Sequence, residues 1–300
     1  MKFGLTLIVL IPRLLWAGAC CLGGGPKSFV LLRPLQSYEL GVSTSFKDNF
    51  GRYNSYGDLV ATEKNQSYNV LLGGTARLTI DTDAFVIVPW VWQFKESLNA
   101  TQSRQTLGDI LVGVRYHLLD NLFEDEWYPK IQISLGVKVP SGKMEALDEL
   151  GQITPGTGNG IWEPSLGVTA QKDYGFVIVS VSPAYVWRLG RSFKSAEGVE
   201  AKLNEGDRIE LTESLTFPIT REWSVAVGSE QSWTLSKKIN GSVMSDTQGR
   251  GITGFISTGY YLTRFWSLGL GFDSALPLSR WGVNQPATRT ISLTSNYSIF

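Results

Sequence analysis

Few side chains in this sequence are suited to catalysis or metal binding, and His117 is the first to consider. It is the only histidine, which excludes multi-histidine metal sites and limits any Ser-His catalysis to this one position. Residues 136–143 look superficially like a phosphate-binding loop, but Met144 follows the lysine where such a loop needs serine or threonine. Residues 156–160 are glycine-rich without a following amphipathic helix, which is typical of a flexible loop. We therefore expect no catalytic residue, metal or cofactor.

Charged side chains form a second group, because they alternate with apolar residues along many segments. Successive side chains of a strand point to opposite faces, so the charged residues of each segment share one face. If the apolar face meets lipid, the charged face lines a lumen. The candidates for lumen lining are Glu39, Arg77, Arg115, His117, Lys130, Lys138, Glu163, Arg188, Arg208, Glu210, Glu230 and Asp273. Their mixed signs predict internal salt bridges, and either a filled interior or a narrow polar path remains open.

These side chains would be positioned by twelve alternating segments, most of them about ten residues long, the length that a tilted strand needs to cross a membrane. In residues 130–139, for example, Ile131, Ile133 and Leu135 alternate with polar or small residues. Glu213 is an exception, since it lies in the apolar register of its segment. We expect strands near residues 38–46, 69–80, 84–94, 109–117, 130–139, 166–170, 176–188, 208–217, 223–233, 252–262, 266–272 and 291–300.

The connections between these segments alternate in length. Long ones are expected near 47–66, 95–107, 140–160, 189–206, 235–249 and 276–289, short ones at 81–83, 173–174, 219–221 and 263–264, and one of intermediate length near 119–127. Short periplasmic turns opposite longer extracellular loops are typical of outer-membrane barrels. The sequence therefore predicts an all-β, closed, antiparallel up-and-down transmembrane barrel of about twelve strands over residues 35–300.

Aromatic residues fall near the ends of the expected strands. Amphipathic rings favour the boundary between water and lipid, so we predict an aromatic girdle that contains Trp90, Trp92, Tyr128, Trp162, Trp187, Trp223, Trp233, Tyr260 and Trp266. The chain also ends on Phe300, within the last expected strand. A final strand with a terminal aromatic resembles the signal that the barrel-assembly machinery reads in outer-membrane proteins.

The first nineteen residues are typical of an export signal. Lys2 precedes an apolar run from Leu5 to Leu15, and Ala17-Gly18-Ala19 forms a small-residue cleavage site. We predict a cleaved signal peptide at 1–19, a periplasmic segment at 20–34 and export to the bacterial outer membrane.

The two cysteines are adjacent, at positions 20 and 21, so they provide no disulfide framework. Two alternatives stay open for the new N-terminus: Cys20 is lipidated, or it is unmodified. Twenty-seven basic residues balance twenty-seven acidic ones, so the chain has no net positive charge to favour nucleic acid as a partner.

The central part of the chain resembles a family of outer-membrane barrels described as transporters of the meta-pathway of phenol degradation. The resemblance rests on residues 108–116, residues 135–142, and residues 156–158 followed by 166–168. The family's Pro-Thr-Gly stands here as Pro140-Ser141-Gly142. The resemblance implies an outer-membrane barrel for uptake of small hydrophobic or aromatic molecules, with lipid and a small solute as partners. It carries no site residue.

Three functions are considered. The first is a passive channel or transporter whose lumen charges set selectivity. The second is a structural or surface-interaction barrel with a filled lumen. The third is a lipid hydrolase resembling outer-membrane phospholipase, but that family places a serine two residues after the histidine, where this chain has Leu119.

Overall fold

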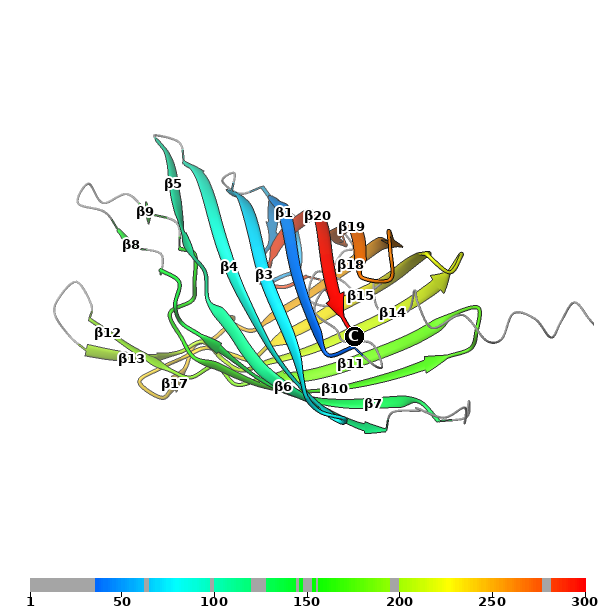
Figure 1. The fold of residues 1–300 in the computed structure, drawn as a ribbon. Helices are drawn as coiled ribbons and strands as arrows, with labels where there is room; N and C mark the ends of the chain where they lie inside the picture. The colour runs from blue at the N-terminus through cyan, green and yellow to red at the C-terminus, as the bar shows by residue number, and fades with distance from the viewer. Residues whose placement is uncertain are drawn as a thin grey trace, which may run out of the picture.

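The computed structural model describes residues 36–61, 65–97, 100–119, 128–143, 146–147, 153–154, 156–194, 200–276 and 282–300. The predicted signal peptide and periplasmic segment lie outside these residues. In the described part, twelve strands form one closed antiparallel barrel (Figure 1). They are β1 (Tyr38–Tyr53), β3 (Asn65–Thr79), β4 (Thr82–Ser97), β6 (Ile110–Leu119), β7 (Lys130–Val139), β10 (Glu163–Asp173), β11 (Ile178–Val186), β14 (Arg208–Pro218), β15 (Trp223–Thr234), β18 (Gly249–Tyr261), β19 (Trp266–Ala275) and β20 (Pro286–Ile299).

The barrel closes where the first strand meets the last. Tyr38 in β1 pairs with Ile299 in β20 on one side and with Ala76 in β3 on the other. Every barrel strand therefore has two hydrogen-bonded neighbours. Closure leaves no free sheet edge, which satisfies the backbone N–H and C=O groups inside a lipid bilayer. The predicted fold class is confirmed.

Side chains alternate between the two faces of the barrel wall. In β1, Tyr38, Leu40 and Val42 are exposed, whereas Glu39 and Ser43 between them are buried. The same arrangement, with apolar side chains outside and polar ones inside, continues around the barrel, where exposed leucine, valine and isoleucine side chains recur on the outer face. A water-soluble barrel would bury its apolar register, so this outer surface is built to face lipid.

Four of the turns on one rim of the barrel are short. Two residues separate β3 from β4, and four separate β10 from β11, β14 from β15, and β18 from β19. Two of these turns share one design: Thr220 Oγ1 accepts a hydrogen bond from the N–H of Trp223, and Thr263 Oγ1 accepts one from the N–H of Trp266, both at 3.0 Å. The repeated turn fixes a tryptophan at the start of the next strand.

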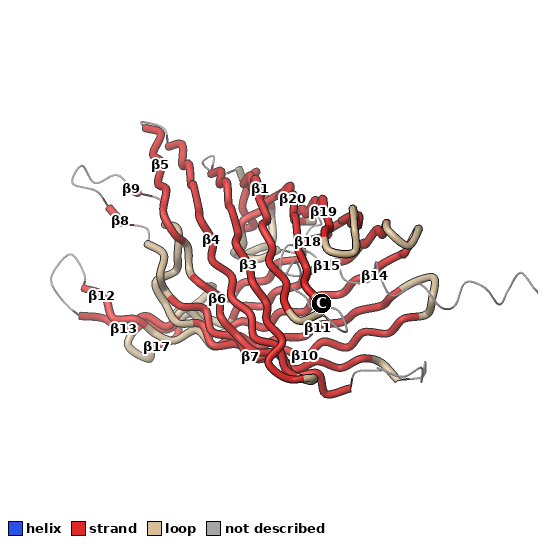
Figure 2. The backbone as a smooth tube through the Cα atoms, viewed as in Figure 1, coloured by secondary structure: helices blue, strands red, loops and turns tan. Residues whose placement is uncertain are grey.

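The opposite rim carries longer loops that contain strands of their own (Figure 2). Residues 95–107 were expected as a loop, but β4 continues to Ser97 and pairs with β5 (Ala100–Leu107), which extends the barrel wall as a hairpin. The loops also form a four-stranded sheet, whose strands are β12 (Arg191–Lys194), β13 (Glu200–Asn204), β16 (Lys238–Ile239) and β17 (Ser242–Val243). Two further pairs are shorter: β8 (Ala146–Leu147) pairs with β9 (Ile153–Thr154), and β2 (Leu59–Val60) pairs with β1. The described residues contain no helix that is long and apolar enough to cross a membrane.

Candidate functional site

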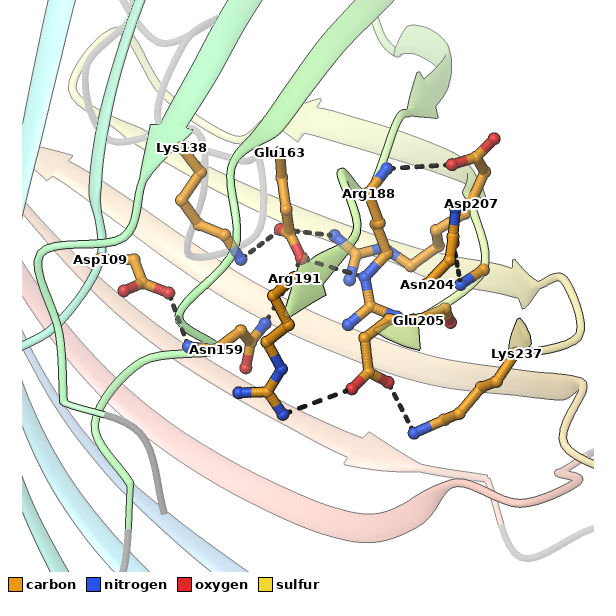
Figure 3. A network of polar contacts seen from close by, with 12 residues as sticks. Asp109, Lys138, Asn159, Glu163, Arg188, Arg191, Asn204, Glu205, Asp207 and Lys237 are labelled. Atoms are coloured by element: carbon orange, nitrogen blue, oxygen red, sulfur yellow. Dashed lines mark hydrogen bonds and ion pairs between the residues drawn. The ribbon is translucent and has the colours of Figure 1, made fainter. Parts of the chain in front are cut away.

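The loop-side end of the barrel interior holds a cluster of charged side chains around Glu163, which we call the loop-side cluster (Figure 3). Glu163 is only 2% exposed. Its Oε1 lies 3.1 Å from Nε of Arg188, its Oε2 pairs with Nζ of Lys138, and Nη2 of Arg208 approaches that oxygen at 3.9 Å. One buried carboxylate is therefore shared by three cations.

Each member of the loop-side cluster lies where a barrel strand meets a loop. Lys138 is near the end of β7, Glu163 begins β10, and Arg208 begins β14. Arg188 follows β11 by two residues. Because antiparallel strands alternate in direction, ends and beginnings of successive strands meet on the same rim, and these charges converge there.

A second layer of contacts ties the long loops to this cluster. Asp207 accepts hydrogen bonds from the backbone N–H of Arg188 at 3.0 Å and from the hydroxyl of Tyr185 at 2.7 Å. Glu205 pairs with Nζ of Lys237 at 2.6 Å and with Arg191 at 3.8 Å. Figure 3 shows Arg188, Arg191, Glu205 and Asp207, from the loop between β11 and β14, near Lys237 from the loop between β15 and β18. The cluster thus fixes the loops over the mouth of the barrel.

A cavity of about 760 Å³ lies beside the loop-side cluster. Its wall contains Arg188, Arg208 and Glu210 near the cluster, and Glu230 and Thr253 from neighbouring strands. Arg208 Nε lies 2.8 Å from an oxygen of Glu210. The cavity is therefore lined by charges of both signs, open between the barrel interior and the loops.

The turn-side end holds a second cluster of charges around Asp83, which we call the turn-side cluster. Asp83 is fully buried. One of its oxygens accepts a hydrogen bond from Nε of Arg77 at 3.2 Å, and the other lies 2.8 Å from Nε2 of His117. The remaining ring nitrogen of His117 lies 3.1 Å from Nε2 of Gln132. Arg115 donates to the hydroxyl of Thr75 at 3.3 Å, and its guanidinium lies over the ring of Phe85.

The structure thus brings eight of the lumen-lining candidates into two groups, one at each end of the barrel interior. Arg77, Arg115 and His117 belong to the turn-side end, and Lys138, Glu163, Arg188, Arg208 and Glu210 belong to the loop-side end. Glu230 lines the cavity. Lys130 begins β7, and Asp273 pairs in register with Thr290.

Sequence reasoning missed several members of these clusters. Asp83, Gln132, Glu205 and Asp207 were not singled out, although each contacts a residue that was. Asp83 was assigned to a turn, and Glu205 and Asp207 fall at a loop boundary. The only signal for Gln132 was its place between the apolar residues of β7.

The aromatic residues expected in a girdle lie at two levels of the wall. Tyr128, Trp223, Tyr260 and Trp266 lie next to turns, and Trp223 and Tyr260 are register partners. Trp162, Trp187 and Trp233 lie at the loop ends of their strands. In β4, the ring centroids of Trp90 and Trp92 are 6.1 Å apart. Most of these rings are exposed on the outer surface.

Comparison with known proteins decides the family. The family model described as "Putative MetA-pathway of phenol degradation" matches residues 73–276, more than half of the chain. The chain belongs to this family. The resemblance found in residues 108–168 is thereby confirmed. Of the matched span, β6, β7 and β10 supply the motifs that carried it.

Several solved structures share the fold of this chain. An outer-membrane channel from Pseudomonas putida F1 superposes with a TM-score of 0.74 at 15% identity, over 91% of this chain and 99% of the channel. The translocator domain of the autotransporter NalP from Neisseria meningitidis gives 0.53 at 10% identity, over 87% and 88%. The transport unit of the autotransporter AIDA-I from Escherichia coli gives 0.51 at 10% identity, over 88% and 91%. At these identities the likeness concerns the fold.

The family, the fold and the apolar outer wall together place this family member in the bacterial outer membrane. Short turns then face the periplasm and long loops the cell exterior. The loop-side cluster and its cavity accordingly lie at the extracellular mouth, and the turn-side cluster lies at the periplasmic end.

Proposed function

We propose that the protein is a passive outer-membrane channel that admits small aromatic or otherwise hydrophobic molecules. The observation that carries the proposal is the cavity of about 760 Å³ inside a closed barrel whose outer wall is apolar. A cavity of this volume accommodates one or a few small molecules. The family description supplies the class of solute, since it refers to phenol degradation.

The interior has two chemically different walls, which suit a solute with an apolar body and a polar group. Phe85 and Leu111 share the inner register with Asp83 and Arg115, and the inner face of β7 at Gly136 lies within contact distance of Leu111. On the other wall, β14 and β15 present hydroxyl and carboxylate groups such as Thr212 and Glu230. A phenol can place its ring and its hydroxyl on these walls respectively.

In this proposal the lumen-lining candidates set the selectivity of the path, and the aromatic girdle anchors the wall at the two membrane boundaries. The chain is exported with its first nineteen residues removed, and Phe300, directly after the last strand, is read by the barrel-assembly machinery. The residues of the two clusters hold charge and position loops, and none of them is assigned a catalytic role.

Conductance in planar lipid bilayers tests the channel. The purified full-length protein is expected to give discrete current steps, and liposomes that contain it are expected to swell in solutions of small sugars. A complete lack of current together with a lack of swelling would overturn the proposal.

The second candidate, a barrel with a filled lumen that acts through its extracellular loops, is favoured by the ion pairs of Glu163 and Asp83 at the two ends. The same conductance measurement separates the two. Hydrolysis is not favoured, because both ring nitrogens of His117 are held by Asp83 and Gln132, which leaves neither to accept a proton from a nucleophile. If the protein hydrolyses lipid, and this activity is lost in His117→Asn but kept in Asp81→Ala, the hydrolase function would be supported.

A further inference from the structure

Glu213 is a carboxylate on the outer face of the barrel. It lies in β14 in the same register as Ile209 and Leu215, and like them it is exposed. Its register partners are Val181 in β11 and Ser229 in β15. The alternation of the sequence predicts this outward position, and neither the fold nor the proposed channel accounts for it.

The depth of Glu213 makes its exposure costly. Four residues toward the loops, Ile209 pairs with Trp233, and four residues toward the turns, Phe217 pairs with Val225, two residues from Trp223. Glu213 thus lies halfway between the two levels of aromatic residues. Since the apolar band of such barrels is about 25 Å tall, its carboxylate lies near the middle of the hydrocarbon, where polar groups need partners.

Two neighbours on β15 donate hydrogen bonds to only one of the two carboxylate oxygens of Glu213. Oε2 of Glu213 accepts hydrogen bonds from the hydroxyl of Ser229 at 3.3 Å and from Nε2 of Gln231 at 3.2 Å. Among the described residues, Oε1 of Glu213 has no hydrogen-bond partner, and the second N–H and the carbonyl oxygen of Gln231 have none either. We call these three side chains the outer polar patch. It exposes both donors and acceptors to lipid.

We propose that the outer polar patch is the contact surface of a two-fold dimer of this protein in the outer membrane. Copies inserted by the same route have the same orientation, so a two-fold axis along the membrane normal brings identical depths of two barrels together. The patch is then opposite itself. The free N–H of Gln231 donates to Oε1 of Glu213 of the partner subunit, and the reciprocal bond forms across the axis.

The surroundings of the patch fit a contact between two barrel walls. Val181, Leu215 and Val227 flank it with exposed apolar side chains, which can pack against the same residues of the second copy. Within a membrane, hydrogen bonds between polar side chains and close van der Waals packing drive such association. Apolar flanks with a self-complementary polar centre therefore identify a second copy as the occupant.

Cross-linking in intact outer membranes tests the proposal. The variant Ser229→Cys is made in full-length protein with Cys20→Ser and Cys21→Ser, and is oxidised in the membrane. The control is Leu72→Cys, because Leu72 is exposed on β3, six strands from β14 in either direction around the barrel. We expect a product of twice the monomer mass from Ser229→Cys and none from Leu72→Cys. A Ser229→Cys protein that stays monomeric, or that links only to a protein of another mass, overturns the proposal.

Two substitutions of Glu213 separate the hydrogen bonds from the rest of the wall. Glu213→Leu removes the polar group and should lower the dimer fraction in mild detergent at least tenfold, whereas Glu213→Gln keeps donors and acceptors and should retain most of it. Both variants should keep the folded barrel's mobility in unboiled gels, because leucine suits a lipid-facing position. Equal dimer fractions in Glu213→Leu and the unmodified protein would contradict the proposal. These readouts do not require the channel to conduct.

Discussion

Asp83 contacts two side chains at the periplasmic end of the barrel, Arg77 and His117. Asp83→Ala would remove the buried carboxylate that both contact. Removing one partner of a buried ion pair costs about 3–5 kcal/mol, and because Arg77 is 18% exposed we expect about 3 kcal/mol. The measurement is the free energy of unfolding from urea titration of the refolded barrel in detergent.

Asp81→Ala is the matched control for Asp83→Ala, because Asp81 lies two residues away in the turn before β4 and its backbone carbonyl accepts a hydrogen bond from the N–H of His117. That contact survives the substitution. We expect Asp81→Ala to change stability by less than about 0.5 kcal/mol. Equal losses in the two variants would show that the turn, rather than the ion pairs, is what stabilises this end.

Glu163 is the acid that three cations share at the extracellular mouth. Glu163→Gln removes its charge and leaves Lys138 and Arg188 beside the path. Because uncompensated positive charge attracts anions, we expect the reversal potential in a potassium chloride gradient to shift toward anion preference. Glu222→Gln, in an exposed periplasmic turn, should leave it unchanged. A shift toward cations in Glu163→Gln would contradict a role in selectivity.

The sequence predicts which way the cluster residues face better than it predicts which residues meet. Alternation places Arg115 and Lys138 on the inner face because both neighbours of each are apolar. Asp83 escapes this reasoning, since β4 has apolar residues on both faces, Phe85 within and Val86 outside. The partners of Asp83 come from β3 and β6, and no pattern within one strand reveals them.

At the scale of single strands, Gly113 marks a place where the inner wall has no room for a side chain. A Cβ there would collide with the backbone carbonyl oxygen of Leu135 and would lie 2.6 Å from a ring carbon of Phe85. We expect Gly113→Ala to destabilise the barrel by about 1–3 kcal/mol, the usual cost of overpacking, as measured by the same urea titration.

Gly269→Ala provides the comparison for Gly113→Ala, since it is another inner-wall glycine within a strand. A Cβ at Gly269 would be no closer than 3.6 Å to its neighbours, which is ordinary contact. We expect its effect to stay below about 0.5 kcal/mol. If Gly269→Ala is as damaging as Gly113→Ala, the close approach of Leu135 and Phe85 to Gly113 is not the cause.

The barrel strands follow from their period of two, whereas the loop strands do not. A membrane strand must be apolar on one face, and this requirement produces an alternation of apolar and polar residues in the sequence. The hairpin formed by β5 carries polar residues on both faces, because it extends beyond the lipid and is held to β4 by backbone hydrogen bonds. The pairing of β13 with β16 joins two loops and likewise lacks a sequence pattern.

For the whole molecule, assembly depends on the last strand meeting the first. Phe300 follows β20 directly, is about half exposed, and contacts the ring of Phe265 at 6.1 Å. Deletion of Phe300 should lower the amount of folded barrel in the outer membrane severalfold, while refolding of the purified variant in detergent should proceed normally. Phe300→Tyr should restore insertion. A deletion that inserts at the normal level would remove Phe300 as an assembly signal.

The hairpin of β16 and β17 turns at Asn240 and Gly241, both with positive φ. Asn240 exchanges two hydrogen bonds with Lys202 in β13, whereas a Cβ at Gly241 would meet nothing within 4 Å, so the open position for an insertion directly follows Gly241. Such tips accept foreign peptide without disturbing the fold. An epitope inserted there would be displayed on the surface of living cells and labelled by antibody without permeabilisation. The loop that covers the mouth of the barrel thus also provides a site at which the protein can be labelled and detected in the outer membrane of living cells.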